Sequence, residues 1–152
     1  MENPSTRATK PGAFETRIIV VPVLRNAQDE ILLCRMAPDR GVFPGQWGLP
    51  GGGMERGERM DEALRREIRE ELGIEITEIQ PLLFKDGLHH KTFPDGSRRP
   101  IYMVFLLFHA RAVSSELSLN DEFSDHAWAR ESDLRTYDLN VQTLDTFDRL
   151  GL

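Results

Sequence analysis

The segment GGGMERGERMDEALRREIREELGIEI, residues 51–76, constrains the fold more than any other part of the chain. Its glycines predict a loop, and apolar residues then recur at the spacing of one helix face. These apolar residues are Met60, Leu64, Ile68 and Leu72. We therefore expect a helix from about Glu58 to Leu72 that stops at Gly73 and packs its apolar stripe on a core.

The same segment holds eight aspartates and glutamates, and three of them border the apolar stripe. Glu67, Glu70 and Glu71 fall within about 100° of one another on a helical wheel. Like charges at this spacing repel by roughly a few tenths of a kcal/mol per pair, and a charge beside a buried face costs more. A solvated helix with Glu–Arg pairs is the ordinary interpretation, but Arg66 can pair with one carboxylate and cannot neutralise three. Three carboxylates beside a glycine-rich loop instead predict a site for Mg²⁺ or Mn²⁺.

The remaining segments alternate between strand and turn signals. β-Branched and apolar residues predict strands at 16–24, 30–36, 74–90, 98–113 and 126–130. The first two should form a hairpin, and a Gly/Pro-rich loop should follow them. Residues 131–151 predict one or two final helices. Mostly antiparallel strands with few helices indicate the α+β or mixed α/β class.

Composition limits the classes of protein that fit. With 152 residues the chain suits one domain, which we expect at 16–152 behind a flexible arm at 1–15. The longest apolar run, Ile101–Phe108, is far shorter than the ~20 residues that span a bilayer, and the N-terminal segment has no apolar signal region. The single cysteine, Cys34, indicates a core position and a reducing cytoplasm. A net charge of −6 argues against a nucleic acid polymer as partner, but not against a small nucleotide.

The spacing of residues around the helix resembles the Nudix box. Gly52 is followed after five residues by Glu58, and after seven more by Arg66-Glu67-Ile68-x-Glu70-Glu71-x-Gly73-Ile74, which agrees with that box at every fixed position. Outside the box, DRGVFPGQWGLPGGG, IYMVFLLF, EFSDHAW and YDLNVQT resemble bacterial nucleoside triphosphatases of the same family over most of residues 16–150. The chain is identified from these residues as a member of the Nudix family.

The resemblance implies a Nudix fold, in which a mixed sheet lies between helices and the box forms a loop–helix–loop. It also implies Mg²⁺-dependent cleavage of nucleoside triphosphates to monophosphate and pyrophosphate, with pyrimidine deoxynucleotides (dTTP, dUTP and dCTP) preferred and Mn²⁺ able to substitute. Glu67, Glu70 and Glu71 become metal ligands, together with the carbonyl of Gly51 or Gly52. Glu67 is also the implied base for the attacking water. Glu58 and Arg66 become structural or orienting partners.

Four residues outside the box are further candidates, and each has an ordinary alternative. Glu122 can act as an extra metal ligand or as the base, or can be a plain loop charge. Arg40 can contact a phosphate or be a surface arginine. Phe43 and Trp47 can stack on a base or pack in the core.

Other functions stay open at this point. ADP-ribose and dinucleoside polyphosphate hydrolases of the family often carry a proline or a tyrosine downstream of the box, where this chain has His89, and then His90, Lys91 and Thr92. Those absences favour a nucleoside triphosphate. His89 and His90 are not expected to bind a metal together, because neighbours on a strand point to opposite faces.

Two alternatives to the triphosphatase remain. One is hydrolysis of oxidised purine nucleotides or of nucleotide sugars, and the other, of a different class, is a nucleotide-binding regulatory module. We expect a small-molecule nucleotide as the partner and no membrane contact. We expect a monomer, with a dimer as the alternative.

Overall fold

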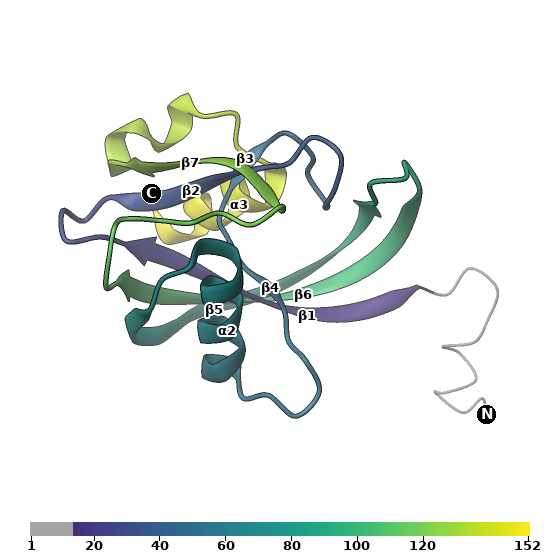
Figure 1. Ribbon diagram of the computed structural model, residues 1–152, viewed down its shortest axis with the longest axis horizontal. Helices are drawn as coiled ribbons and strands as arrows, with labels where there is room; N and C mark the ends of the chain where they lie inside the picture. Colours follow the sequence, from purple (N-terminus) through teal and green to yellow (C-terminus); the bar gives the residue numbers. More distant parts are fainter. Residues whose placement is uncertain (1–13) are drawn as a thin grey trace.

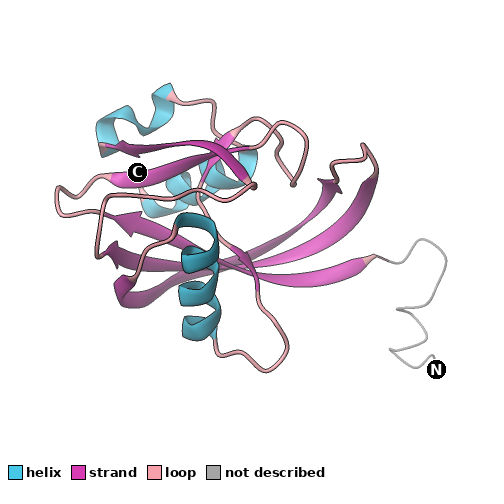
Figure 2. Cartoon of the chain, in the orientation of Figure 1, coloured by secondary structure: helices cyan, strands magenta, loops and turns pink. Residues whose placement is uncertain are grey.

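A curled, mixed β-sheet forms the centre of the computed structural model, which describes residues 14–152 (Figure 1). Its main path runs β3-β2-β1-β6-β5, while β4 pairs with β1 and β7 pairs with β2. β1 (Glu15–Arg25) lies parallel to β6 (Arg98–Ala112) along its whole length, and β5 (Ile76–Thr92) is antiparallel to β6. The expected mixed α/β class, with a curled sheet and few helices, is confirmed (Figure 2).

The predicted arm at residues 1–15 lies outside the described residues except for its last two. Phe14 stacks on Tyr102 with ring centroids 6.3 Å apart. Glu15 already belongs to β1, where it pairs with Ile101. The first strand therefore begins one residue earlier than the sequence predicts.

The hairpin expected from the first two strands is present only at its closed end. β1 and β2 (Ile31–Met36) share one register pair, Arg25 with Ile31, and then separate. β2 pairs instead with β7 (Phe123–Ala129) and β3 (Trp47–Gly48). This separation divides the sheet into a β7-β2-β3 part and a β4-β1-β6-β5 part, which can be followed in Figure 1.

α2 (Met60–Leu72) packs its apolar stripe against buried residues of β1, β2 and β6. Together they form the first core cluster, which includes Val20, Leu24, Leu32 and Phe108. Leu64, Ile68 and Leu72 are each 0% exposed, and Gly73 ends the helix in the left-handed region with a φ of 69°. Met60 is 51% exposed, so the prediction that it faces the core is wrong. The reason is its place in the first turn, which lies on the rim of a surface groove beside β5 and not over the core.

The start of α2 also differs from the prediction. Glu58 precedes the helix, because its side chain accepts a 2.7 Å hydrogen bond from the backbone N–H of Glu55 and closes a turn there. Arg59 takes the N-cap position in an extended conformation. The helix therefore begins two residues later than the predicted start at about Glu58.

The end of the chain packs against β2 in a second core cluster, which includes Ile31, Leu33, Leu134, Leu139 and Phe147. η1 (Glu131–Thr136) and α3 (Val141–Leu150) are the two helices expected at residues 131–151. The Asn140 side chain caps α3 by accepting a 2.8 Å hydrogen bond from the backbone N–H of Thr143. Phe147, at 0% exposure, anchors α3 in this cluster.

The Gly/Pro-rich loop between β2 and α2 contains two strands that are not predicted from the sequence. β3 and β4 (Gly52–Gly53) are two residues each, and β4 pairs with β1 through Gly52 and Val20. Gly41 and Thr92 exchange backbone hydrogen bonds of 2.9 and 2.8 Å, which tie the loop to the end of β5. The loop is thus fixed to the sheet at both of its ends.

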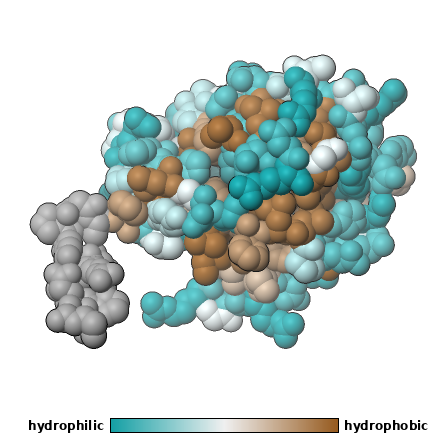
Figure 3. Space-filling model, turned by 180° about the vertical axis from the view of Figure 1, so that it is seen from behind, coloured by the Kyte–Doolittle hydropathy of each residue, from teal (hydrophilic) through white to brown (hydrophobic). Residues whose placement is uncertain are grey.

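The buried and exposed apolar residues add two observations. Cys34 is 1% exposed, as predicted for a core residue. Apolar side chains also remain at the surface, as the brown areas of Figure 3 show, and Phe84 is 80% exposed. No helix within residues 14–152 is long and apolar enough to cross a membrane.

The difference between Leu64 and Met60 gives a stability prediction. Leu64→Ala should lower the free energy of unfolding by about 2–5 kcal/mol, because it leaves a cavity in a fully buried site. Met60→Ala, on the same helical stripe, should change it by no more than about 0.5 kcal/mol. Urea denaturation followed by circular dichroism measures both values. Equal losses in the two variants would contradict the observed position of the first turn.

Candidate metal and catalytic site

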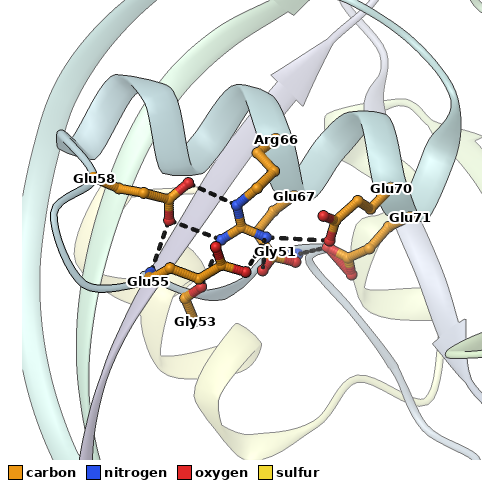
Figure 4. Close-up of polar contacts among 8 residues, drawn as sticks. All are labelled: Gly51, Gly53, Glu55, Glu58, Arg66, Glu67, Glu70 and Glu71. Carbon is orange, nitrogen blue, oxygen red and sulfur yellow. Dashed lines mark hydrogen bonds and ion pairs between the residues drawn. The ribbon is translucent and has the colours of Figure 1, made fainter.

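Arg66 organises the acidic face of α2 (Figure 4). Its guanidinium donates to both oxygens of Glu58, at 2.6 and 2.9 Å, and to the carbonyl of Gly53 at 2.9 Å. Its Nη1 also donates to Glu67 at 3.0 Å and to Glu70 at 3.1 Å. The expectation that Arg66 pairs with a single carboxylate is wrong, because the planar fork of donors reaches several acceptors at once.

Glu58 fastens the loop to the helix. Hydrogen bonds from Arg66 lower the pKa of Glu58 to about 2, and the backbone N–H of Glu55 acts in the same direction. The carboxylate therefore remains charged at any pH near neutrality. These contacts fit the structural role that the family resemblance implies for Glu58 and Arg66.

Glu71 is the most deeply buried acid of the site, at 1% exposure. Its Oε1 accepts a 3.2 Å hydrogen bond from the backbone N–H of Gly51. Its Oε2 receives no hydrogen bond from a donor within residues 14–152 and has the Glu122 carboxyl group as a neighbour. Burial raises the pKa of Glu71 well above its usual value. The charges of Glu122 and Glu67, and a hydrogen bond between the carboxyl groups of Glu71 and Glu122, add to the increase. A buried oxygen without a donor is costly, so this side chain is poorly explained by the stability of the protein alone.

Glu67 lies directly against the glycine-rich strand β4. It is 9% exposed, and burial raises its pKa while Arg66 acts in the opposite direction. A Cβ atom at Gly52 would collide with the Glu67 carboxylate, so any larger residue at position 52 would displace it. Gly51 has a φ of +142°, and a Cβ there would collide with the carbonyl oxygen of Val20. Residues 51 and 52 must therefore be glycine for the carboxylate to approach the backbone.

Glu70 differs from the other two glutamates. Its side chain is 55% exposed and bonds to Arg66. Within residues 14–152, no three Asp, Glu, His or Cys side chains are placed so that they could hold a metal ion together. Glu67 and Glu70 each accept a hydrogen bond from Nη1 of Arg66. The donors still suit a divalent cation, because they are hard carboxylate oxygens and one of them, Oε2 of Glu71, is buried without a hydrogen-bond donor.

A cavity of about 400 Å³ opens beside these acids. Gly51–Gly53, Glu67 and Glu122 line one side of it, so Glu122 is brought to the same cavity as Glu67. Cationic side chains also line it, and two of them, Arg17 and Lys91, were not among the residues predicted from the sequence. The available signal for Arg17 is a charge within the apolar strand segment TRIIVVPVL.

The other predicted substrate contacts lie at different places. Arg40 lines the cavity and pairs with its neighbour Asp39 at 3.1 Å. Phe43 is outside the cavity lining and packs edge-on against His89, with ring centroids 5.3 Å apart. Trp47 packs against Tyr137 in the second core cluster, at 5.1 Å between centroids. The structure therefore brings Arg40, but neither aromatic residue, to the cavity wall.

The two adjacent histidines take different environments. His89 contacts the rings of Phe43 and Phe105, whereas His90 is exposed. Burial lowers the pKa of His89. The prediction that this pair does not form a shared site agrees with these positions.

Known proteins resemble the chain in both sequence and structure. The nucleoside triphosphatase NudI of Escherichia coli O139:H28 is 52% identical over 138 residues, which cover 90% of this chain and 97% of that protein. The protein of the same name from Shigella sonnei has the same identity and coverage. A crystal structure of a MutT NUDIX hydrolase from Burkholderia pseudomallei superposes with a TM-score of 0.69 at 26% identity, and the match covers 90% of this chain and 98% of that one.

The family itself follows from the extent of the match. The family model described as the NUDIX domain aligns with residues 15–150, which include the sheet, the α2 site and the cavity. Together with the intact box on α2, this match shows that the chain belongs to the Nudix family of hydrolases.

Proposed function

We propose that this protein hydrolyses nucleoside triphosphates to the monophosphate and pyrophosphate in a reaction that depends on Mg²⁺. The observation that carries the proposal is a pair of buried carboxylates, Glu67 and Glu71, next to the glycines at 51–53. These glycines line a cavity that cationic side chains also line. Relatives named nucleoside triphosphatase NudI, at 52% identity, support the substrate class.

Glu67, Glu70, Glu71 and the carbonyl of Gly52 would hold the metal. Oε2 of Glu71 supports this assignment, because a buried oxygen without a donor is ready to bind a cation. A bound divalent cation would neutralise phosphate charge and make a water molecule more acidic, and Mn²⁺ can replace Mg²⁺. Glu70 contributes from an exposed position next to Arg66.

The side chains supply the remaining requirements of the reaction. Water must attack one phosphorus, lose a proton to a base, and displace pyrophosphate. We assign the base to Glu67, because it holds the matching position of the box, lies beside Glu70 and Glu71 and lines the cavity, and because burial raises its pKa. Glu122 is the other candidate, since it reaches the same cavity from the loop before β7.

We further propose pyrimidine deoxynucleotides, dTTP, dUTP and dCTP, as the preferred substrates. This preference is what the family resemblance of the sequence implies. The relatives named nucleoside triphosphatase support a triphosphate as the substrate class, and the missing downstream proline and tyrosine support a triphosphate over ADP-ribose or dinucleoside polyphosphates. Neither Phe43 nor Trp47 lines the cavity, so a base bound there does not stack on either ring.

A substrate screen tests the proposed reaction. Incubation with each common dNTP, NTP and nucleotide sugar, with Mg²⁺, should release pyrophosphate and monophosphate fastest from dTTP, dUTP or dCTP. EDTA should abolish turnover, and Mg²⁺ or Mn²⁺ should restore it. Full turnover without metal would contradict the site. Fastest turnover of an oxidised guanine nucleotide or a nucleotide sugar would overturn the substrate while leaving the family mechanism intact.

A pair of variants decides between the two candidate bases. Glu67→Gln should reduce kcat on the order of 10²-fold or more at saturating Mg²⁺, whereas Glu122→Gln should reduce it less. Glu62→Gln, an exposed acid on α2, is the matched control and should keep normal kcat. A larger loss in the Glu122 variant than in the Glu67 variant would move the base to the loop.

A further inference from the structure

Arg17 lies near the start of β1. Side chains alternate along β1, so Arg17 shares one face with Ile19, Val21 and Val23. Val21 and Val23 are 5% and 3% exposed on that face, and Met103, the β6 partner of Arg17, is 8% exposed. Exposure rises along this row from Val21 through Ile19 to Glu15, and the Arg17 side chain is 39% exposed. Arg17 therefore lies where the row leaves the core and reaches the cavity.

The contacts of Arg17 place its guanidinium against Gly53 in β4. A Cβ atom at Gly53 would collide with Nη2 of Arg17, so the guanidinium lies directly on that residue. The carbonyl of the same glycine accepts a 2.9 Å hydrogen bond from Arg66. Two arginines from different elements therefore meet at Gly53, and both lie next to the strand that supports Glu67.

The two arginines differ in how far their donors are already used. Arg66 bonds Glu58, Glu67, Glu70 and the Gly53 carbonyl. Arg17 has an ion pair with Glu15 at 3.7 Å, and the Glu15 side chain is 64% exposed. An exposed pair at this distance is weak, so within residues 14–152 the donors of Arg17 are not held by a strong ion pair and can bind a ligand in the cavity.

We propose that Arg17 binds the phosphate chain of the substrate, an inference that rests on the proposed hydrolysis of a polyphosphate nucleotide. A guanidinium presents paired N–H donors that match phosphate oxygens. Ile19, Ile101 and Met103 line the cavity with Arg17, and the acids of the lining are Glu67 and Glu122, which belong to the proposed metal and catalytic site. Arg40 and Lys91 add two further cations to the same cavity, and the Lys91 ammonium lies 5.4 Å from the Phe93 ring centroid. Arg17 is thus assigned as a substrate-binding residue.

Steady-state kinetics of Arg17→Gln and Arg17→Lys tests this assignment. Arg17→Gln should raise KM for a hydrolysed nucleoside triphosphate roughly tenfold or more, as for loss of a charge-assisted hydrogen bond, with a smaller change in kcat. Arg17→Lys should recover part of the loss, because it restores the charge without the paired donors. Arg130→Gln, an exposed arginine outside the cavity lining, is the control and should leave KM unchanged.

Calorimetric binding of inorganic tripolyphosphate separates this inference from the proposed activity. The wild-type protein should bind it and Arg17→Gln should bind it at least roughly tenfold more weakly, with an unchanged melting temperature. A wild-type protein that binds tripolyphosphate through Arg17 but cleaves no nucleoside triphosphate would refute the activity alone. Unchanged KM and unchanged tripolyphosphate affinity in Arg17→Gln, or no binding by the wild type, would overturn the role of Arg17.

Discussion

Two carboxylates, Glu67 and Glu71, are buried beside the glycines at 51–53, and Arg66 neutralises them only in part. Arg66 donates to Glu67, whereas Oε2 of Glu71 receives no hydrogen bond from a donor within residues 14–152. Burial raises the pKa of both acids. Such an arrangement lowers the stability of a protein unless a cation compensates, which is why we interpret it as a metal site.

The fold supplies the support that this burial requires. The apolar stripe of α2 packs on the first core cluster, so the acidic face of the helix is presented to the β4 glycines. β4 in turn pairs with β1, the central strand that also carries Arg17. Arg66 of α2 donates a hydrogen bond to the carbonyl of Gly53 in β4, so α2 and β4 are joined at a residue that lines the cavity. Packing of the helix and geometry of the site are therefore coupled.

The sequence predicts the parts of this structure that depend on local patterns. Periodicity predicts most of α2 and the long strands, and the box spacing predicts the family that the domain match shows. Met60 and the start of α2 were misassigned, because periodicity does not show where a helix extends beyond its core. β3 and β4 are too short to leave a periodic signal, and the cavity position of Arg17 depends on register between strands that are distant in sequence. Trp47 was ambiguous for the same reason, since its partner Tyr137 comes from the far end of the chain.

The melting temperature of Glu71→Gln, measured with and without Mg²⁺, tests whether the buried Glu71 carboxylate binds a metal. Because burial raises the pKa of Glu71 in the folded state, the protein loses stability as the pH rises from the unfolded-state pKa of about 4.3 through the folded-state pKa. Glutamine carries no charge, so at neutral pH the Glu71→Gln variant should have a metal-free melting temperature equal to or above that of the wild type. The variant should also lose the Mg²⁺-dependent increase that the wild type shows, while Glu62→Gln should keep it. A metal-free melting temperature far below that of the wild type, with the Mg²⁺ response retained, would show that Glu71 is a structural residue and not a metal ligand.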